Sequence, residues 1–356
     1  GVSRETYGLR VGPGWDAPNA ESIPILEIWE DFQCPACKDL EVASGATIID
    51  LALESKVRLE WRAALFLDDM LVDKNSASGN PNSSLRATMA QGCAADAGRG
   101  LEYHRAVFER QPENEGDGYS NDTLVEMVGK WKTSFDNKEG GPNRAPKFPI
   151  PNNYQFLLRF GVLNKDKEVL RHVKLTLDKM AYGGIYDQIG GGFARYSVDS
   201  EWKVPHFEKM LYDNAQLISL YAKAYQRTGK VLYREIVTET LSFIERELTA
   251  PEGVCYSALD ADSEGEEGKF YTWTVEELSN VDFPASETHD IASLIQDYYA
   301  VNGKGLWEHG RNILLRTSSD EDFAAKHRLS TADWKSIVVQ CKEQLLAVRA
   351  QRVRPG

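Results

Sequence analysis

The chain has 356 residues, a formal net charge of −13, 42% hydrophobic residues and 10% aromatic residues. This length and composition fit a globular protein with two hydrophobic cores and exclude disorder as its main state. The acidic balance, without a basic stripe, argues against a nucleic-acid partner, and the sequence has no run of about 18 apolar residues that would span a membrane.

The first informative element is a buried strand predicted at residues 23–29, where β-branched and aromatic residues are bounded by polar turns. It runs into a Cys-Pro-Ala-Cys sequence that contains Cys34 and Cys37. If Cys34 starts the next helix, the free amide groups and the helix dipole stabilise its thiolate. Cys37, one turn further on, is then close enough to form a disulfide with Cys34. The pattern indicates a redox-active dithiol.

A zinc site is the alternative interpretation of the same two cysteines. A closed zinc site needs four ligands, and the other cysteines, Cys93, Cys255 and Cys341, each stand alone in the sequence. We therefore favour a redox pair and expect no metal and no other cofactor.

Residues 7–131 resemble the DsbA-like thioredoxin-fold disulfide oxidoreductases, in which a strand ending in Asp-Phe-x-Cys-Pro-x-Cys precedes a second strand and a helical insertion. The resemblance implies a second strand at 57–63, helical structure within 84–108, an attacking thiolate at Cys34 and a resolving thiol at Cys37.

This family also has a cis-proline loop, a strand hairpin and a last helix, which we do not find after Trp131. Ala145-Pro146 is a candidate cis peptide, but the prolines within 147–151 are incompatible with two sheet strands. We expect an incomplete α/β thioredoxin-like domain over residues 1–133, with an open sheet edge that favours association unless it is covered.

The composition changes near Ser134, and residues 134–356 predict helices separated by glycine-rich turns. Helices are expected at 154–161, 168–180 and 205–227. The glycines at 190–192 lack the spacing of a dinucleotide-binding motif, so we expect a flexible turn there.

The helix expected at 205–227 carries an apolar stripe and, opposite it, a line of polar residues. This line is either a solvated face or part of a binding cleft. Its members are His206, Lys209, Asp213 and Gln216.

The acidic segment 260–267 resembles the start of a calcium loop, but Tyr271 stands where the loop needs a bidentate glutamate. The alternatives are a solvated acidic turn or a sugar-facing site, because Tyr271 and Trp273 follow directly and aromatic faces pack on pyranose rings.

Most of residues 135–356 resembles the YyaL family, which includes a spermatogenesis-associated relative. The segments that carry the resemblance are 183–199, 202–215, 260–263, 267–273 and 349–352. The family joins a thioredoxin-like domain to an α/α toroid similar to six-hairpin glycosidases, and the resemblance implies an all-α, partial toroid over 134–356 with about half of the helical hairpins.

In such a ring the inner helices point polar residues into a cleft that binds sugars. The resemblance therefore implies His206 and Asp213 as general acid and base. The residues expected to contact a substrate are Asp187, Glu208, Asp260, Asp262, Tyr271 and Trp273.

The two halves predict different functions. The first is a thiol–disulfide oxidoreductase that acts on a protein dithiol or disulfide. The second is a carbohydrate-directed isomerase or hydrolase-like activity, and a third is a binding module with neither activity. DsbA-like proteins usually work outside the cytoplasm, whereas the second resemblance and the three other cysteines favour a reducing compartment, so we expect the cytoplasm.

Overall fold

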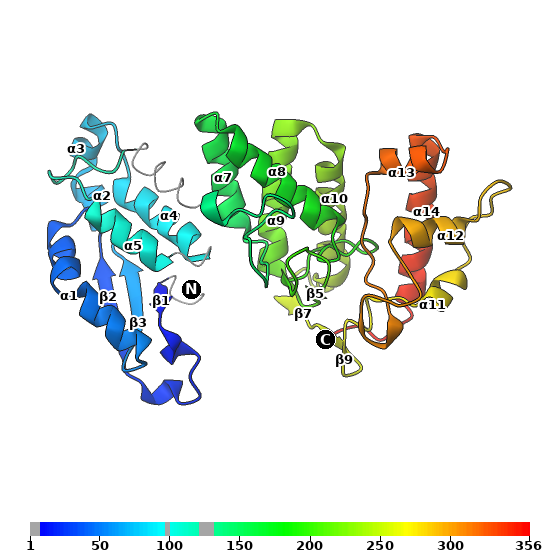
Figure 1. The fold of residues 1–356 in the computed structure, drawn as a ribbon, viewed down its shortest axis with the longest axis horizontal. Helices are drawn as coiled ribbons and strands as arrows, with labels where there is room; N and C mark the ends of the chain where they lie inside the picture. Colours follow the sequence, from blue (N-terminus) through cyan, green and yellow to red (C-terminus); the bar gives the residue numbers. More distant parts are fainter. Residues whose placement is uncertain (1–7, 97–99, 121–131) are drawn as a thin grey trace. The chain divides into compact units, whose positions relative to one another are not determined.

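The structure is a computed structural model that describes residues 8–96, 100–120 and 132–356, without the side chains of Cys93 and Asp96. The chain divides into two compact units, residues 1–134 (unit 1) and 135–356 (unit 2). Unit 1 mixes a small sheet with helices, and unit 2 is mainly helical (Figure 1).

Unit 1 contains a three-stranded sheet in the order β1–β3–β2. Strand β2 (Ile25–Glu30) pairs in parallel with β3 (Arg58–Ala63), and β1 (Leu9–Val11) pairs antiparallel with β3. Helix α1 (Pro35–Leu53) supplies the crossover that two parallel strands require. Both strands predicted before and after the dithiol are confirmed to within two residues at each end.

The other helices of unit 1 follow β3, and α4 and α5 confirm the helical structure predicted within 84–108 where the chain is described. They are α2 (Phe66–Met70), α3 (Val72–Ala77), α4 (Ser83–Asp96) and α5 (Gly100–Glu109), with 3-10 turns at Pro13–Trp15, Ala20–Ser22 and Lys132–Ser134.

The two faces of the sheet differ in chemistry. On one face Leu59 and Trp61 of β3 pack against Ile49 and Ala52 of α1 to form a hydrophobic core. On the other face the buried Glu60 carboxylate accepts hydrogen bonds from its neighbours, which are Arg10 at 2.8 Å and Arg62 at 3.1 Å. This alternation follows from the two-residue period of a strand.

Strand β2, which leads to the dithiol, lies at one edge of the sheet. Among the described residues no other strand pairs with its outer side. Trp29 is 60% exposed and Ile25 is 49% exposed on this strand. The described part of unit 1 thus has the open edge that the sequence predicted.

Unit 2 is built largely from helices, and the first four pack as neighbours: α7 on α8, α7 on α9, and α9 on α10. The helices expected at 154–161 and 168–180 are confirmed and are slightly longer than predicted. In chain order the helices are α7 (Pro151–Leu163), α8 (Lys167–Tyr182), α9 (Leu211–Thr228), α10 (Val231–Glu247), α11 (Val275–Ser279), α12 (Ile291–Tyr298), α13 (Asp320–Lys326) and α14 (Thr331–Arg349), with a 3-10 turn at Glu308–Gly310.

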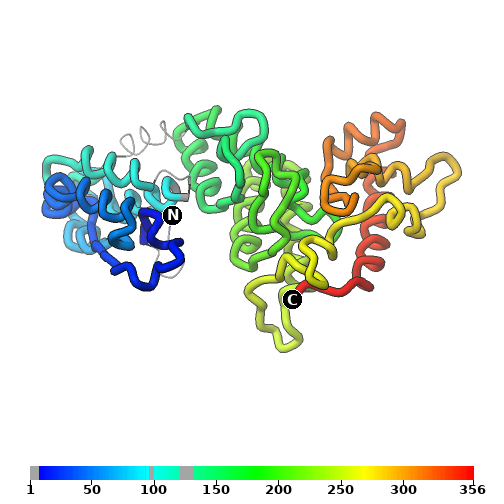
Figure 2. The backbone as a smooth tube through the Cα atoms, turned by 60° about the horizontal axis from the view of Figure 1, so that its bottom comes forward, coloured from blue at the N-terminus to red at the C-terminus, as the bar shows by residue number. Residues whose placement is uncertain are grey.

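Short antiparallel strand pairs connect these helices. The pairs are β4 (Tyr196–Ser197) with β5 (Pro205–His206), β6 (Lys209–Met210) with β7 (Ala258–Leu259), and β8 (Asp262–Ser263) with β9 (Glu266–Glu267). The C-terminal end of the chain returns to this region (Figure 2), where the amide of Asp260 donates to the carbonyl of Gly356 at 2.9 Å.

Two sequence predictions for unit 2 are wrong. The helix expected at 205–227 begins only at Leu211, because residues 205–210 form β5 and β6 instead. The glycines at 190–192 are all buried and pack closely against neighbouring groups, so they form a close-packed turn rather than a flexible one. The peptide bond Ala145-Pro146, a candidate cis site in the sequence, is cis and belongs to unit 2.

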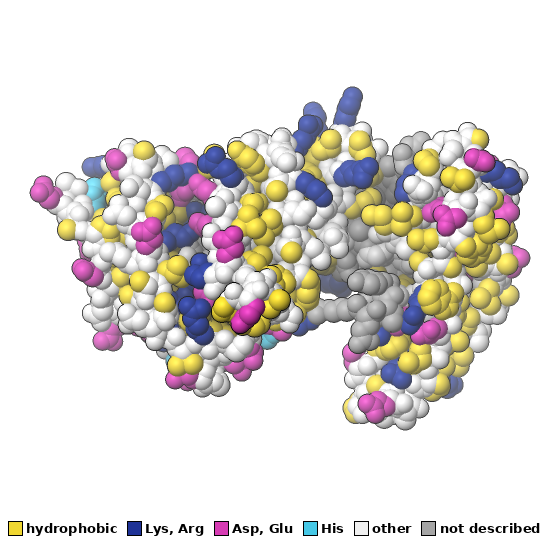
Figure 3. Space-filling model, turned by 180° about the vertical axis from the view of Figure 1, so that it is seen from behind, with side chains coloured by type: hydrophobic (Ala, Val, Ile, Leu, Met, Phe, Trp, Pro, Cys, Tyr) yellow, Lys and Arg dark blue, Asp and Glu magenta, His cyan; other side chains and the backbone are white. Residues whose placement is uncertain are grey.

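On the face drawn in Figure 3, the basic side chains are scattered among acidic and apolar ones and form no continuous stripe over the described residues. Within the described parts of the chain, none of the helices has the length and apolar character needed to cross a membrane.

Candidate functional sites

The dithiol lies where strand β2 passes into helix α1. Cys34 is the N-cap residue of α1 in an extended conformation, and Pro35 is the first helical residue. Proline fits there because its position needs no amide donor. Both Cys34 and Cys37 are half-buried, free cysteines. The sequence therefore sets the local geometry of this site.

Residues late in the sequence of unit 1 form hydrogen bonds with the loop before Cys34. The side-chain amide of Gln111 donates to the carbonyls of Phe32 at 2.8 Å and Cys34 at 2.9 Å. The Tyr119 hydroxyl donates to the Phe32 carbonyl at 2.6 Å. These contacts satisfy backbone groups that would otherwise be buried without a partner.

A buried carboxylate fixes the same loop from the other side. Asp31 accepts hydrogen bonds from the amides of Gln33 at 2.9 Å and Leu67 at 3.0 Å, and from the hydroxyl of Ser84. Burial raises the pKa of Asp31 above its usual range. The loop is thereby tied to α2 and α4 as well as to the sheet.

The two cysteines differ in their surroundings. Burial raises the pKa of the Cys37 thiol to about 12, and the nearby Cys34 and Glu30 add to this effect. Cys37 therefore stays a protonated thiol near neutral pH.

Unit 2 holds a second candidate site around a buried ionic cluster. Asp187 accepts hydrogen bonds from the Lys209 ammonium at 2.9 Å and from the Arg349 guanidinium at 2.8 Å. Burial alone would raise the pKa of Asp187, but these two cations hold it well below its usual range. Burial lowers the pKa of Lys209 to about 8, and the positive charge of Arg349 lowers it further, while Asp187 acts in the opposite direction.

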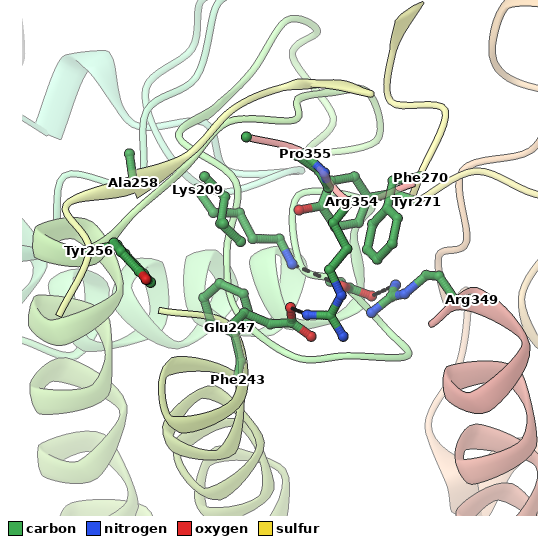
Figure 4. Close-up of a pocket in the computed structure, with 13 residues that line it drawn as sticks. Lys209, Phe243, Glu247, Tyr256, Ala258, Phe270, Tyr271, Arg349, Arg354 and Pro355 are labelled. Atoms are coloured by element: carbon green, nitrogen blue, oxygen red, sulfur yellow. Dashed lines mark hydrogen bonds and ion pairs between the residues drawn. The ribbon is translucent and has the colours of Figure 1, made fainter. Parts of the chain in front are cut away.

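A cavity of about 270 Å³ opens beside this cluster (Figure 4). Its walls include the aromatic rings of Phe243 and Tyr271, which lie 4.5 Å and 4.7 Å from the Lys209 nitrogen. Arg354 and Glu247 form an ion pair at the same cavity. The site combines ammonium and guanidinium donors with aromatic faces, the mixture found in many small-molecule pockets.

The glycine-rich turn shapes the ionic cluster. The amides of Ile189 and Gly190 donate to the Asp187 carboxylate at 3.1 Å and 2.9 Å. A Cβ atom at Gly190 would lie 1.9 Å from the Arg349 guanidinium. The turn therefore needs glycine here so that Arg349 can reach Asp187.

The expected acid and base lie outside this cavity. His206 is on β5, with its Nδ1 2.8 Å from a carboxylate oxygen of Glu267, and it stacks on Tyr196. Asp213 lies in the first turn of α9, and Glu208 pairs with Arg195 at 2.8 Å. Because 205–210 is extended, the predicted helical line of His206, Lys209, Asp213 and Gln216 does not form.

The acidic segment forms a tight hairpin. Asp260 and Asp262 are exposed, and Glu264 and Gly265 between β8 and β9 both have positive φ angles, as in a type I′ turn. Among the described residues, the one group of three possible metal ligands does not include these carboxylates. Tyr271 lines the cavity, whereas Trp273 is fully buried in the core formed by α11–α14.

Of the expected substrate residues, only Asp187 and Tyr271 line the cavity. From the sequence, Lys209 was named only as part of a polar helical line, and Arg349 was not named as a site residue. In the structure Pro205, Phe207 and Lys209 are buried and alternate with half-buried residues, which is the period of a strand, but the sequence does not reveal this because Lys209 is charged. The helical spacing of Phe207 and Met210 concealed it.

No protein-family model matches the chain. It is 36% identical to spermatogenesis-associated protein 20 of Mus musculus over 61% of this chain and 30% of that protein. The human protein of the same name is 35% identical over 62% of this chain and 31% of its own length. An uncharacterized protein of Caenorhabditis elegans is 33% identical over 69% of this chain and 37% of its length.

Unit 1 holds 134 of the 356 residues, so a match over 61% of the chain must extend into unit 2. The chain spans about a third of the length of the curated relatives that it matches. These identities support the relationship of its C-terminal part to the spermatogenesis-associated family.

Proposed function

We propose that unit 1 is a thiol–disulfide oxidoreductase module in which Cys34 and Cys37 exchange with a disulfide of a protein partner. The observation that carries the proposal is the arrangement of the pair: Cys34 is at the start of a 19-residue helix and Cys37 has a pKa raised by burial to about 12. One sulfur is placed to attack and the other is kept in reserve as a thiol.

The exchange has two balanced steps. The Cys34 thiolate attacks one sulfur of the substrate disulfide, a mixed disulfide forms, and the other substrate sulfur leaves as a thiolate and takes up a proton. Cys37 then loses its proton and attacks the Cys34 sulfur, which releases the second substrate thiolate. The substrate gains two electrons and two protons, and the Cys34–Cys37 pair becomes a disulfide.

The test is equilibration of the purified chain with mixtures of reduced and oxidised glutathione, followed by thiol counting of Cys34 and Cys37. We expect a reversible two-electron transition with one defined reduction potential. Cys34→Ser should abolish exchange, and Cys37→Ser should trap a mixed disulfide with glutathione. Cys255→Ser changes an exposed cysteine of unit 2 and is the matched control. Exchange that survives Cys34→Ser would refute the proposal.

As a second function, we propose that the cavity of unit 2 binds a carbohydrate. Asp187 and Tyr271, both expected to contact a substrate, line this cavity together with Lys209 and Arg349. Charged donors can bind sugar hydroxyl groups while aromatic rings cover the apolar face of a pyranose. His206 and Asp213 remain candidates for acid–base roles only in a longer cleft that reaches them.

A thermal-shift screen with neutral and acidic mono- and disaccharides tests the second proposal. At least one sugar should raise the unfolding midpoint, and Tyr256→Ala should reduce that shift, because Tyr256 is an exposed aromatic residue of the cavity wall whose loss does not open the core. Tyr212→Ala changes an exposed tyrosine away from the cavity and is the control. If no sugar shifts the midpoint, this function is wrong.

A further inference from the structure

Three side chains of unit 1 that are distant in sequence meet in the protein interior. Glu30 ends β2, Glu41 lies in the second turn of α1, and His104 lies in α5. One ligand atom of each lies within 4.8 Å of the others. The His104 side chain is 1% exposed, and those of Glu30 and Glu41 are 4% and 7% exposed.

The polar atoms of this group lie within ion-pair distance of one another, but their angles do not fit those of a regular hydrogen bond. His104 Nε2 lies 3.2 Å from Glu30 Oε2 and 3.4 Å from Glu41 Oε1. Yet neither oxygen of Glu30, nor Glu41 Oε1, nor His104 Nε2 makes a hydrogen bond of acceptable geometry within the described parts of the chain. Buried polar atoms without partners are rare in folded proteins and call for an explanation.

The charges of Glu30, Glu41 and His104 also call for an explanation. Two carboxylates in the interior either take up a proton or need compensation by positive charge, because an unpaired buried charge is strongly unfavourable. One imidazole, even when protonated, offers a single positive charge for two negative ones. A divalent cation would neutralise both carboxylates while leaving the imidazole neutral.

We propose that Glu30, Glu41 and His104 bind a divalent transition-metal ion. In a tetrahedral zinc site with ligand distances of about 2.0–2.2 Å, the ligand atoms are about 3.4 Å apart. The separations from His104 Nε2 to the two carboxylates, 3.2 Å and 3.4 Å, have this size. One imidazole and two carboxylates form a donor set suited to Zn²⁺ and to similar first-row ions.

The surroundings hold His104 in position for this role. Its ring stacks on Trp61 at a centroid distance of 4.2 Å, and its Nδ1 lies 2.9 Å from the side-chain amide of Gln91. After a half-turn of that amide, the oxygen of Gln91 accepts the Nδ1 hydrogen, and the Nε2 lone pair is free for the ion. Ligating histidines usually have such a partner on the other ring nitrogen.

A glycine makes room for Glu41. Gly45 lies one turn further along α1, and a Cβ atom there would be 2.6 Å from Glu41 Oε2. Glycine inside a helix is unfavourable compared with alanine, so its presence at this contact fits a carboxylate that must keep one orientation. Gly45→Ala therefore disturbs the site without removing a ligand and without weakening the helix.

The test uses the full chain in a Cys34→Ser/Cys37→Ser background, so that the dithiol cannot bind metal. After chelator treatment, the protein is dialysed against Zn²⁺ or Co²⁺, and the bound metal is measured by mass spectrometry. We expect one ion per chain, and a Co²⁺ spectrum with d–d bands but without a thiolate charge-transfer band. His104→Gln and Glu41→Gln should each weaken binding at least tenfold.

Gly45→Ala tests the site even if the ligand variants misfold, because it changes no ligand. It should fold as well as the parent by circular dichroism and bind Zn²⁺ more weakly, and chelator should lower the unfolding midpoint of the parent more than that of Gly45→Ala. Absence of bound metal in the folded parent, or unchanged binding in His104→Gln, Glu41→Gln and Gly45→Ala, would overturn the proposal.

Discussion

The ammonium nitrogen of Lys209 lies 2.9 Å from the Asp187 carboxylate, whose other oxygen accepts a hydrogen bond from Arg349 at 2.8 Å. All three side chains are at least nine-tenths buried. One anion thus compensates two cations, and the stability of unit 2 should depend on it more than on either cation.

Asp187→Asn tests this dependence. The substitution leaves Lys209 and Arg349 without a counter-ion in the interior, and removing one partner of a buried pair typically destabilises a protein by about 3–5 kcal/mol. Lys209 then becomes neutral more easily, because burial already lowers its pKa to about 8. Urea unfolding of unit 2, followed by tryptophan fluorescence, measures the loss.

Glu201→Gln is the matched control, because it removes the carboxylate of the exposed Glu201–Lys203 ion pair. Exposed ion pairs contribute little to stability, because water and salt screen them. If both variants lose the same stability, Asp187 does not hold the cluster together.

The change in the free energy of unfolding between pH 7 and pH 4 should depend on His172. Burial lowers the pKa of His172 to about 4, and the ring stacks on Phe135 at a centroid distance of 3.7 Å. Below about pH 6.5 the histidine becomes protonated in the unfolded chain but stays neutral in the folded protein. The free energy of unfolding therefore falls as the pH drops toward 4, by up to about 3 kcal/mol. His172→Phe keeps the stack and should flatten the curve in this interval.

Unfolding free energies between pH 4 and pH 7 provide the measurement. His309→Asn changes an exposed histidine and should leave the slope as it is. An unchanged slope in His172→Phe would contradict the assignment.

A side chain in the turn formed by the glycines at 190–192 should destabilise the protein. Gly191 has a φ of +76°, and a Cβ atom there would lie 2.4 Å from the Glu239 carbonyl oxygen. Gly253 has a similar φ of +85° but has open space around it. We expect Gly253→Ala to lose about 1–2 kcal/mol from backbone strain alone.

Gly191→Ala should lose several kcal/mol more than Gly253→Ala, because the backbone of α10 would have to move. Thermal unfolding of the two variants side by side isolates the steric part. Equal losses would show that the turn has more freedom than its packing indicates.

Alkylation of the native protein should distinguish reactive cysteines from unreactive ones. Burial raises the pKa values of Cys37 and Cys341 to about 12, whereas Cys255 is exposed and Cys34 half-buried. Iodoacetamide at pH 7.5 should label Cys34 and Cys255, and peptide mass spectrometry identifies the labelled sites. Cys341 should react only after urea is added; rapid native labelling of Cys341 would contradict its burial.

The sequence could predict the dithiol because its determinants are local. An apolar strand, a proline suited to the first helical turn and a two-residue spacing between cysteines all lie within 23–37. Helices α7 and α8 were predictable for the same reason: each has a regular apolar face.

The cavity of unit 2 could not be predicted in this way. Residues 205–210 satisfy both a helical and an extended pattern, and the choice is made by pairing of β6 with β7, almost 50 residues later. Arg349 reaches Asp187 across 162 positions, and no local pattern contains that contact. The Glu30–Glu41–His104 group was missed for the same reason, because its ligands come from three separate elements.

The contacts of Gln111 and Tyr119 with the dithiol loop also bear on how the protein forms. They join groups 77 to 87 positions apart, so the loop closes late compared with helix α1, whose contacts are local. During synthesis, both cysteines leave the ribosome long before the residues that hold their loop. The nascent chain therefore carries a flexible dithiol, open to pairing with other thiols, until residue 119 is available to complete the fold.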